Sequence, residues 1–280
     1  MNAYVWLEGQ GDRGANNITS CLYKDFKARG YFNQRNYGSL TIIADNCAGQ
    51  NKNKHVVRFL MSLVELKWFP QITLIFLIKG HTKNACDRLF NLVKLNYHRK
   101  NIFDYNDLVD NLNNNKFISA SKVKPEEFKD HLKWQDQLYR TPASGDFTRT
   151  HIFTIKSDNP TVLIKQDHDG AEMRYENLLP TRRSRKALQL TKQERIAKLK
   201  LMENDIETLA EPGIRAIKQV ELYQKWRPPL PVEKRDLTCP KPADEILKKV
   251  RDERRTKAAT NRKRKKPEDN SNCSDAVYNI

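Results

Sequence analysis

Two acidic residues and one histidine stand where this chain could carry phosphodiester chemistry. Asp45 directly follows the apolar run 39–44, His81 comes shortly after the apolar run 72–78, and Asp87 lies in the segment behind it. Hard cations such as Mg²⁺ or Mn²⁺ prefer oxygen ligands. Two such ions can activate a water or a 3′-hydroxyl and stabilise the leaving oxygen of a phosphodiester. Asp45 and Asp87 are therefore candidate metal ligands and catalytic residues, with His81 as a third catalytic candidate.

The segments around these residues predict alternating strands and helices. The runs 39–44 and 72–78 are short, apolar and rich in β-branched residues, which favours buried strands, whereas 52–67 and 83–97 have apolar residues at helical spacing. This order predicts an α/β fold with parallel strands covered on both faces. Ligands of such sheets bind beyond the carboxyl ends of the strands. Asp45 and His81 should therefore share one edge, with Asp87 in the first turns of the following helix.

The same spacing also has a purely structural explanation. An Asp-Asn pair after a strand is a common turn and helix cap, and Asp87 can be an ordinary exposed acid of a helix. Two acids are also too few for a two-metal site, so a third would have to come from a neighbouring strand. Spacing alone favours the structural explanation.

Two longer motifs change this balance. Residues 44–53 read Ala-Asp-Asn-Cys-Ala-Gly-Gln-Asn-Lys-Asn, and residues 76–90 contain Gly-His-Thr followed by Asp-x-x-Phe. Both resemble a family of uncharacterised domains found in transposon-derived proteins, which is itself similar to RNase H-like (DDE/D) transposases. Weaker similarities to the family lie in 4–22 and 212–242. The resemblance implies that Asp45 is the acid of the fourth strand of that fold and Asp87 the acid of the helix after the fifth, with His81 lining the site.

The sequence departs from the RNase H-like pattern at its first catalytic acid. That acid belongs to the first strand of the fold, and if residues 4–7 are the third strand, the first two strands are missing. Glu8 and Asp12 are nearby, but their connectivity is wrong for this role. We therefore expect a partial RNase H-like fold, weak Mg²⁺ or Mn²⁺ binding and no robust nuclease activity, which leaves enzymatic function uncertain.

The rest of the chain gives a looser pattern. We predict helices over 105–112 and 126–138 and a hairpin of 151–156 with 161–165. A capping box at Thr191 and Glu194 opens a helix that runs to about residue 209, and 226–231 is expected to be an extended, Pro-rich linker. The predicted organisation is 1–100 partial RNase H-like domain, 101–180 mixed α+β extension with the hairpin, 181–238 helical region and linker, and 239–280 basic tail, disordered from about residue 261.

The net charge of +17 predicts a polyanionic partner. Residues 181–280 hold 26 lysines and arginines against 15 aspartates and glutamates, so the excess is concentrated there. The cluster at 262–267 fits a nuclear localisation signal or a phosphate-contacting arm, although a basic tail can also serve only solubility. The candidate nucleic-acid-binding residues are Lys52, Lys54, Lys83, Arg88, Arg262, Lys263, Arg264, Lys265 and Lys266.

Other classes of site and location are less favoured. No apolar stretch is long enough to span a membrane, and the first residues do not resemble a signal peptide. Five scattered cysteines without a CxxC pair favour a reducing compartment. Cys47, His81 and Cys86 could be three zinc ligands, but their spacing matches no common zinc module, so buried thiols are the preferred interpretation.

These observations lead to three functional hypotheses. The first is a transposon-derived nuclear protein that binds nucleic acid, with DNA favoured over RNA, through a degenerate RNase H-like domain and a basic tail. The second is an active Mg²⁺-dependent nuclease or strand transferase completed by upstream sequence, whose cleavage would be lost in Asp45→Asn and Asp87→Asn variants. The third is a nuclear protein-interaction scaffold, whose partners would survive nuclease treatment.

Overall fold

The structure, a computed structural model, describes residues 1–33, 38–77, 85–98, 100–140, 150–157, 161–165, 173–179 and 189–264. The chain divides into two compact units, Met1–Gly213 and Ile214–Ile280. The sequence predicted boundaries near residues 100, 180 and 238 instead. The difference arises because helices and strands after residue 100 pack directly onto those before it and complete the first unit.

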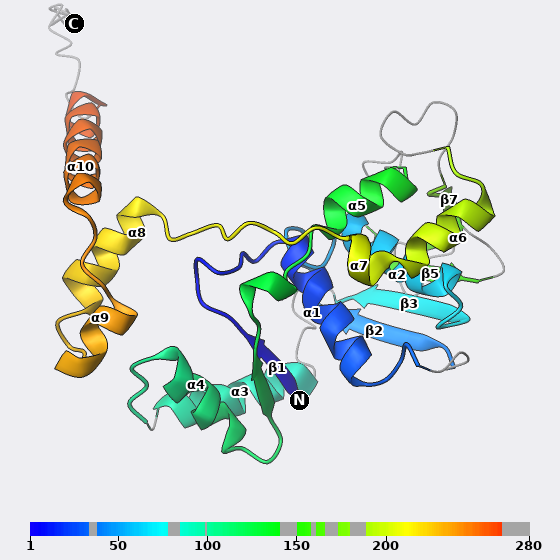
Figure 1. The fold of residues 1–280 in the computed structure, drawn as a ribbon, viewed down its shortest axis with the longest axis horizontal. Coiled ribbons are helices and arrows are strands. Elements are labelled where there is room, and N and C mark those ends of the chain that lie inside the picture. Colours follow the sequence, from blue (N-terminus) through cyan, green and yellow to red (C-terminus); the bar gives the residue numbers. More distant parts are fainter. Residues whose placement is uncertain are drawn as a thin grey trace, which may run out of the picture. The chain divides into compact units, whose positions relative to one another are not determined.

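The first unit contains a mixture of helices and short strands (Figure 1). Its elements in chain order are β1 (Asn2–Val5), α1 (Ala15–Ala28), β2 (Leu40–Ala44), α2 (Lys54–Glu65), β3 (Gln71–Phe76), α3 (Ala85–His98), α4 (Tyr105–Asn113), β4 (Ser119–Lys122), the 3₁₀ turn η1 (Pro125–Glu127), α5 (His131–Leu138), β5 (Ile152–Lys156), β6 (Thr161–Lys165), β7 (Met173–Asn177), α6 (Lys192–Lys200) and α7 (Met202–Asp205).

The larger sheet confirms the predicted strand–helix–strand–helix order of residues 40–97. Its strand order is β2-β3-β5-β6-β7, and β2 and β3 are parallel. The remaining pairs are antiparallel, so β5 and β6 form the predicted hairpin. β1 does not join this sheet and pairs in parallel with β4. The interpretation of residues 4–7 as a strand of the main sheet is therefore wrong for this structure.

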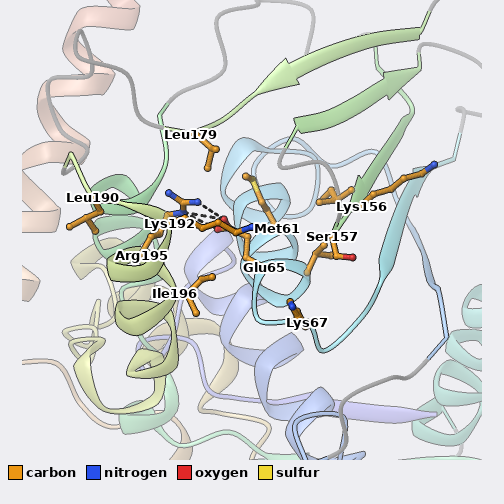
Figure 2. Close-up of a pocket in the computed structure, with 12 residues that line it drawn as sticks. Met61, Glu65, Lys67, Lys156, Ser157, Leu179, Leu190, Lys192, Arg195 and Ile196 are labelled. Carbon is orange, nitrogen blue, oxygen red and sulfur yellow. Dashed lines mark hydrogen bonds and ion pairs between the residues drawn. The ribbon is translucent and has the colours of Figure 1, made fainter.

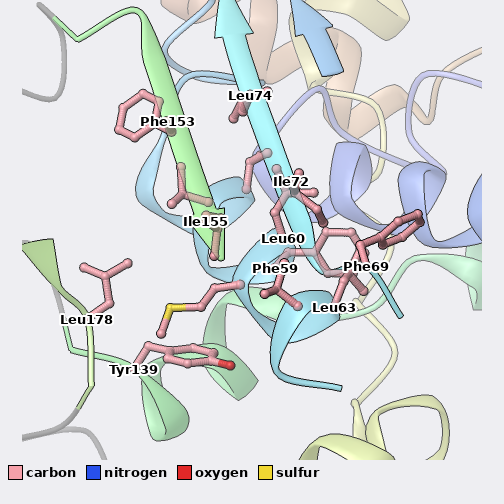
Figure 3. Packing of buried hydrophobic residues seen from close by; sticks show 14 of the residues in the cluster. Phe59, Leu60, Leu63, Phe69, Ile72, Leu74, Tyr139, Phe153, Ile155 and Leu178 are labelled. Carbon is pink, nitrogen blue, oxygen red and sulfur yellow. The ribbon is translucent and has the colours of Figure 1, made fainter. Parts of the chain in front are cut away.

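Helix α2 lies at the centre of the main core. All nine residues from Val56 to Val64 are buried, because α2 contacts β3 and β5 on one side and α1 and α5 on the others. Figure 3 shows Leu60 of α2 close to Ile72 of β3, with Leu74 further along the same strand. The sequence predicted one apolar face for this helix, whereas the structure surrounds it, which is typical of a core helix.

The sheet is covered more thoroughly on one face than on the other, which corrects the prediction that both faces are buried. Alternate residues of β3 are buried against α2, but Ile43 of β2 is 55% exposed and Thr41 is also exposed. The apolar run of β2 suggested two buried faces because composition alone does not distinguish a central strand from an edge strand. β2 is at the edge of this sheet.

A second, smaller core holds the two-stranded sheet. Val109 and Leu112 of α4 and Ile118 and Ala120 around β4 are buried, and Val93 of α3 packs against them. β4 was not predicted, because its sequence Ser-Ala-Ser-Lys contains one apolar residue. Its place depends on pairing with β1, which lies more than a hundred residues earlier in the chain.

Two predicted helices are interrupted. The segment 126–138 splits into η1 and α5, since Phe128 is extended and nearly fully buried and Asp130 caps α5 through the backbone N–H of Lys133. The helix that begins at the confirmed capping box of Thr191 and Glu194 is interrupted at Leu201 and ends at Asp205 instead of continuing to 209.

The second unit is a compact helical module. It consists of α8 (Ala216–Glu221), the π-helical turn η3 (Leu222–Trp226), the 3₁₀ turn η4 (Val232–Lys234), α9 (Arg235–Thr238) and α10 (Asp244–Arg264). Val220 of α8 and Val250 of α10 are buried where these helices pack. Among the described residues of both units, no helix combines the length and apolar character needed to cross a membrane.

The expected extended linker at 226–231 and the basic tail from 239 are both folded to a larger extent than predicted. Trp226 ends a π-helical turn, and the guanidinium of Arg235 donates to the carbonyls of Leu230 and Pro228, both at 3.0 Å. Arg227 donates to the Cys239 carbonyl at 2.9 Å. The basic segment is helical as far as Arg264. These side chain–backbone bonds fix a segment whose prolines alone suggested an extended chain.

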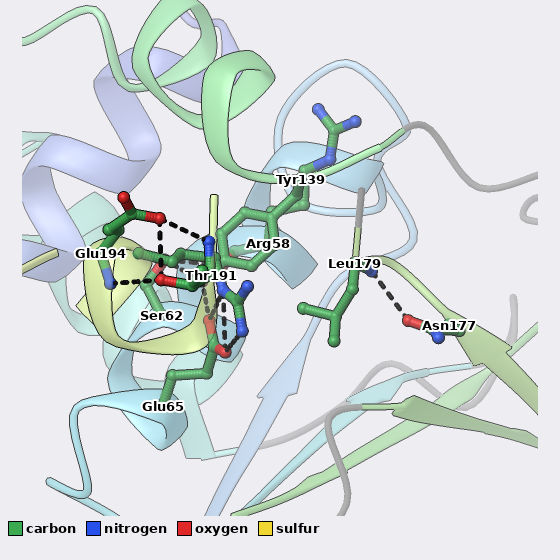
Figure 4. A network of polar contacts seen from close by, with 9 residues as sticks. Arg58, Ser62, Glu65, Tyr139, Asn177, Leu179, Thr191 and Glu194 are labelled. Atoms are coloured by element: carbon green, nitrogen blue, oxygen red, sulfur yellow. Dashed lines mark hydrogen bonds and ion pairs between the residues drawn. The ribbon is translucent and has the colours of Figure 1, made fainter. Parts of the chain in front are cut away.

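A buried ion pair joins α2, α5 and α6. Arg195 donates to both carboxylate oxygens of Glu65, with the closest approach at 2.7 Å, and the Tyr139 hydroxyl donates to Glu65 at 2.6 Å. Figure 4 shows Glu65 near Tyr139 and Ser62. Burial, followed by the Glu65 charge, raises the pKa of Tyr139 well above its usual range. The carboxylate thus has donors from two other helices or their ends.

We predict that Arg195→Ala lowers the free energy of unfolding by about 3 kcal/mol, because it leaves the Glu65 carboxylate buried without its cation. The double variant Glu65→Leu/Arg195→Met should lose less, since both charges are removed together. Urea unfolding of the wild type, both single variants and the double variant measures the coupling. If the free-energy losses of the two single variants add up to the loss of the double variant, the two side chains do not stabilise each other and the role of this pair is contradicted.

Other buried polar groups lack partners. His131 is 2% exposed, and neither of its ring nitrogens has a hydrogen-bond partner among the described residues; the same holds for the side-chain amide of Gln135 one turn later. Burial lowers the pKa of His131 to about 3. Burial, and then the Arg58 and Lys54 charges, lower the pKa of His55 to about 4.

Acid should therefore destabilise the first unit before its carboxylates titrate. Unfolded histidines bind protons below about pH 6.5, whereas folded His131 and His55 do so only near 3 and 4. Stability is thus complete above pH 6.5 and falls as the pH decreases toward 4. Urea unfolding between pH 7.5 and 4.5 should show a smaller decrease in His131→Phe than in the wild type. His98→Phe, which replaces an exposed histidine, is the control. If His131→Phe and the wild type lose the same free energy of unfolding between pH 7.5 and 4.5, this explanation is excluded.

Candidate functional site

Asp45 lies where the sequence predicted it, at the carboxyl end of two parallel strands. β2 ends at Ala44, which pairs with Phe76, the last residue of β3. The Asp45 carboxylate is exposed and accepts a hydrogen bond from the side-chain amide of Asn51. Asp45 is therefore accessible to a ligand, and the loop that follows it orients its oxygens.

The loop from Cys47 to Asn53 is held by its own hydrogen bonds. The backbone N–H groups of Gln50, Asn51 and Lys52 all donate to the Cys47 carbonyl, at 2.9–3.2 Å. Asn53 caps α2, since its side-chain oxygen accepts from the N–H groups of His55 and Val56 at 3.0 and 3.1 Å. The helix therefore starts at Lys54, two residues later than predicted.

The structure places Lys52 differently from its predicted role as a surface phosphate contact. It is 4% exposed, and its ammonium lies 5.6 Å from the centre of the Phe76 ring. Burial lowers its pKa. This cation–π contact attaches the loop to the end of β3, which leaves little of Lys52 for a ligand. Lys54, by contrast, is only half-buried.

Asp87 lies in the first turn of α3, as expected, and both Asp87 and Arg88 are exposed. α3 packs against α4 and contributes Val93 to the second core. His81 and Lys83 lie outside the described residues. The meeting of Asp45 and Asp87 at one edge of the sheet therefore stays a prediction.

A metal site has no complete set of ligands in the part of the chain that the structure describes. No three histidine, cysteine, aspartate or glutamate side chains come together there. Cys47 is a half-buried free thiol, and the side chain of Cys86 is outside the description. Mg²⁺ or Mn²⁺ at Asp45 and Asp87, and zinc at Cys47, His81 and Cys86, stay hypotheses from the sequence.

A second candidate surface lies entirely within the second unit. Three arginines of α10 line one side of a cleft of about 450 Å³ whose other side is formed by α8 and η3. The Arg254 guanidinium lies 3.5 Å from the side-chain oxygen of Gln224. The cleft residues are Val220, Tyr223, Gln224, Leu247, Val250, Arg251, Arg254 and Arg255.

The sequence indicated this surface only in part. Arg262, Lys263 and Arg264 belong to the last turn of α10, while Lys265 and Lys266 lie outside the described residues. The arginines at 251, 254 and 255 are spaced so that they share one side of a helix. That spacing, next to the buried Val250, could have predicted a basic side of a packed helix. It was overlooked because residues 239–280 were interpreted as a tail.

We predict that Asn53→Ala lowers the free energy of unfolding by about 1 kcal/mol, because two N–H groups of α2 lose their acceptor. Asn53→Asp should keep most of the stability, since a carboxylate caps equally well. Asn46→Ala, an exposed change in the same loop, is the control. Equal stability of Asn53→Ala and the wild type in thermal or urea unfolding would show that water replaces the cap.

Comparison with known proteins gives one result for the first unit. Residues 1–170 match the family described as "Domain of unknown function (DUF7869)". Searches of curated proteins and of solved structures found no significant match. Because the family match covers more than half of the chain, this protein belongs to the DUF7869 family.

Proposed function

We propose that this protein is a transposon-derived nuclear protein that binds nucleic acid, with DNA as the favoured partner. The observation that carries the proposal is the arginine-lined cleft of the second unit. Arg251, Arg254 and Arg255 present three guanidinium groups along about one turn of α10. Arginine suits phosphate because its planar fork can donate two parallel hydrogen bonds to phosphate oxygens.

The charge along α10 supports a polyanion rather than an isolated anion. From Arg254 to Arg264 the helix contains six basic residues and no acid. Asp244 and Glu245 are in the first turn of α10, where the helix dipole favours acids, and its other two acids, Asp252 and Glu253, do not line the cleft. A row of positive charge of this kind follows a phosphate backbone and carries no sequence information by itself. The cluster at 262–267 also supports a nuclear location.

Neighbouring groups in the cleft suit the same ligand. Tyr223 offers a ring on which a base or sugar can pack, and the Arg227 guanidinium already lies 5.5 Å from its centre. Glu221, the acid at the end of α8, is paired with Lys225 at 2.9 Å, and this contact lowers the pKa of Glu221. The acid is therefore already compensated and does not cancel the arginine charges.

The ancestry of the first unit is proposed on two features. The crossover β2–α2–β3 joins two parallel strands, and Asp45 stands directly after the first of them. These features agree with a partial RNase H-like transposase core. We propose that this core is a degenerate one and that the basic second unit provides the nucleic-acid binding.

Binding to fluorescently labelled duplex DNA at 50–200 mM salt tests the proposal. The triple variant Arg251→Gln/Arg254→Gln/Arg255→Gln should bind more weakly at every salt concentration. Its slope of log K against log salt should be shallower by about 2.7 if each arginine neutralises one phosphate. Anisotropy titrations of DNA and of an RNA hairpin give both quantities.

The matched control removes the same charge from the first unit, in Lys94→Gln/Lys116→Gln/Lys200→Gln, three exposed lysines outside the cleft. It should keep nearly the wild-type slope. Equal losses in both triple variants would mean that only net charge matters, and an unchanged slope in the arginine variant would exclude the cleft.

A further inference from the structure

The first unit contains a cavity of about 310 Å³ that none of the functions above uses. It lies between the C-terminal end of α2, the end of β5 and the N-terminal turn of α6, as Figure 2 shows. Its volume is at the lower end of the range for small-molecule sites. The lining residues are Met61, Val64, Glu65, Lys67, Ile155, Lys156, Ser157, Leu179, Leu190, Lys192, Arg195 and Ile196.

The charges around the cavity are unbalanced. Glu65, the one acid among its lining residues, is already neutralised by Arg195 and also accepts from Tyr139. Lys67, Lys156 and Lys192 remain, and none of them has an ion pair with any described residue. These lysines come from three separate elements. The lining therefore carries an excess positive charge that an anion would compensate.

The walls between these lysines are apolar. Met61 and Val64 come from α2, Ile155 from β5, and Leu190 and Ile196 from the region of α6. Inorganic phosphate would gain nothing from such walls, because it has no apolar surface to bury. A ligand that combines an anionic group with a flat or apolar body would use both parts of the lining.

Backbone geometry holds one lysine at the rim. Lys67 has a φ of 59°, a left-handed conformation that costs a non-glycine residue free energy. It is maintained by the turn that ends α2, in which Lys67 N–H donates to the Val64 carbonyl at 3.0 Å and Trp68 N–H to that of Leu63 at 3.1 Å. Lys67 is thus positioned by the main core rather than by a mobile loop.

The lysines of the lining favour one kind of anionic group. Lys67 and Lys192 both line the cavity and each carries a full positive charge. A phosphate monoester carries about −1.5 to −2 charge near neutral pH, so it can compensate two lysines at once. The expected ligand therefore carries a phosphate.

We propose that this cavity binds a small organic phosphate of mononucleotide size, with the phosphate on Lys67 and Lys192 and the body against the aliphatic walls. The site lies within the first unit and does not depend on the arginine cleft of the second unit. The two proposals can therefore fail separately.

Calorimetric titration of the full chain with AMP, adenosine and inorganic phosphate tests the two parts of the lining. AMP should bind more tightly than either of the other compounds, because only AMP carries both the anion and the body. Equal affinity for adenosine would overturn the role of the lysines. Equal affinity for phosphate would overturn the role of the walls, and absence of AMP binding at millimolar concentration would overturn the proposal entirely.

Three variants and one control locate the site. Lys192→Gln and Lys67→Gln should each weaken AMP binding about tenfold, the effect of losing one charge-assisted contact. Lys200→Gln removes the same charge further along α6, outside the cavity, and should bind AMP like the wild type. Ser157→Trp, which places a large ring at the exposed rim, should abolish AMP binding while circular dichroism stays unchanged. AMP binding unaffected by all three cavity changes would exclude this cavity.

Discussion

Nine consecutive residues of α2, from Val56 to Val64, are buried, and the rest of the first unit is arranged around them. Each fully buried apolar side chain in this helix contributes roughly 1.5–3 kcal/mol. Arg58 lies within the same stretch and is completely buried, which is costly for a cation. Its guanidinium is satisfied by Asp136 at 2.7 Å and by the Arg140 carbonyl at 3.2 Å, so the cost is offset by contacts with α5 and the chain after it.

Helix α2 connects the loop that contains Asp45 with the lysine-lined cavity. Its N-terminus is capped by Asn53, directly after the loop that presents Asp45. Its last residue, Glu65, and Lys67 in the turn that follows help to form the cavity on the other side of the core. The predicted catalytic edge and the lysine-rimmed cavity are therefore at opposite ends of one buried helix. A change in the packing of α2 would be felt at both.

Basic residues are used in two different ways in this protein. In the first unit, Lys67 and Lys192 stand at the rim of an aliphatic cavity, and each offers a compact point charge. In the second unit, Arg251, Arg254 and Arg255 lie along a helix and offer planar forks. The first arrangement suits one phosphate with an apolar body, and the second suits successive phosphates of a backbone. The overall charge of +17 did not distinguish these arrangements.

The order of residue types was sufficient to predict the features that depend on local physics. Apolar β-branched runs placed β2 and β3, the capping box placed the start of α6, and Asp45 was correctly located at a strand end. The folded chain was needed to show that Ile43 is exposed, that Lys52 is buried against Phe76, and that β4 pairs with β1. It alone brought Lys67 and Lys192 to one cavity. These features depend on contacts between residues far apart in the chain, and no local pattern of residue types records which distant surface will cover a given side chain.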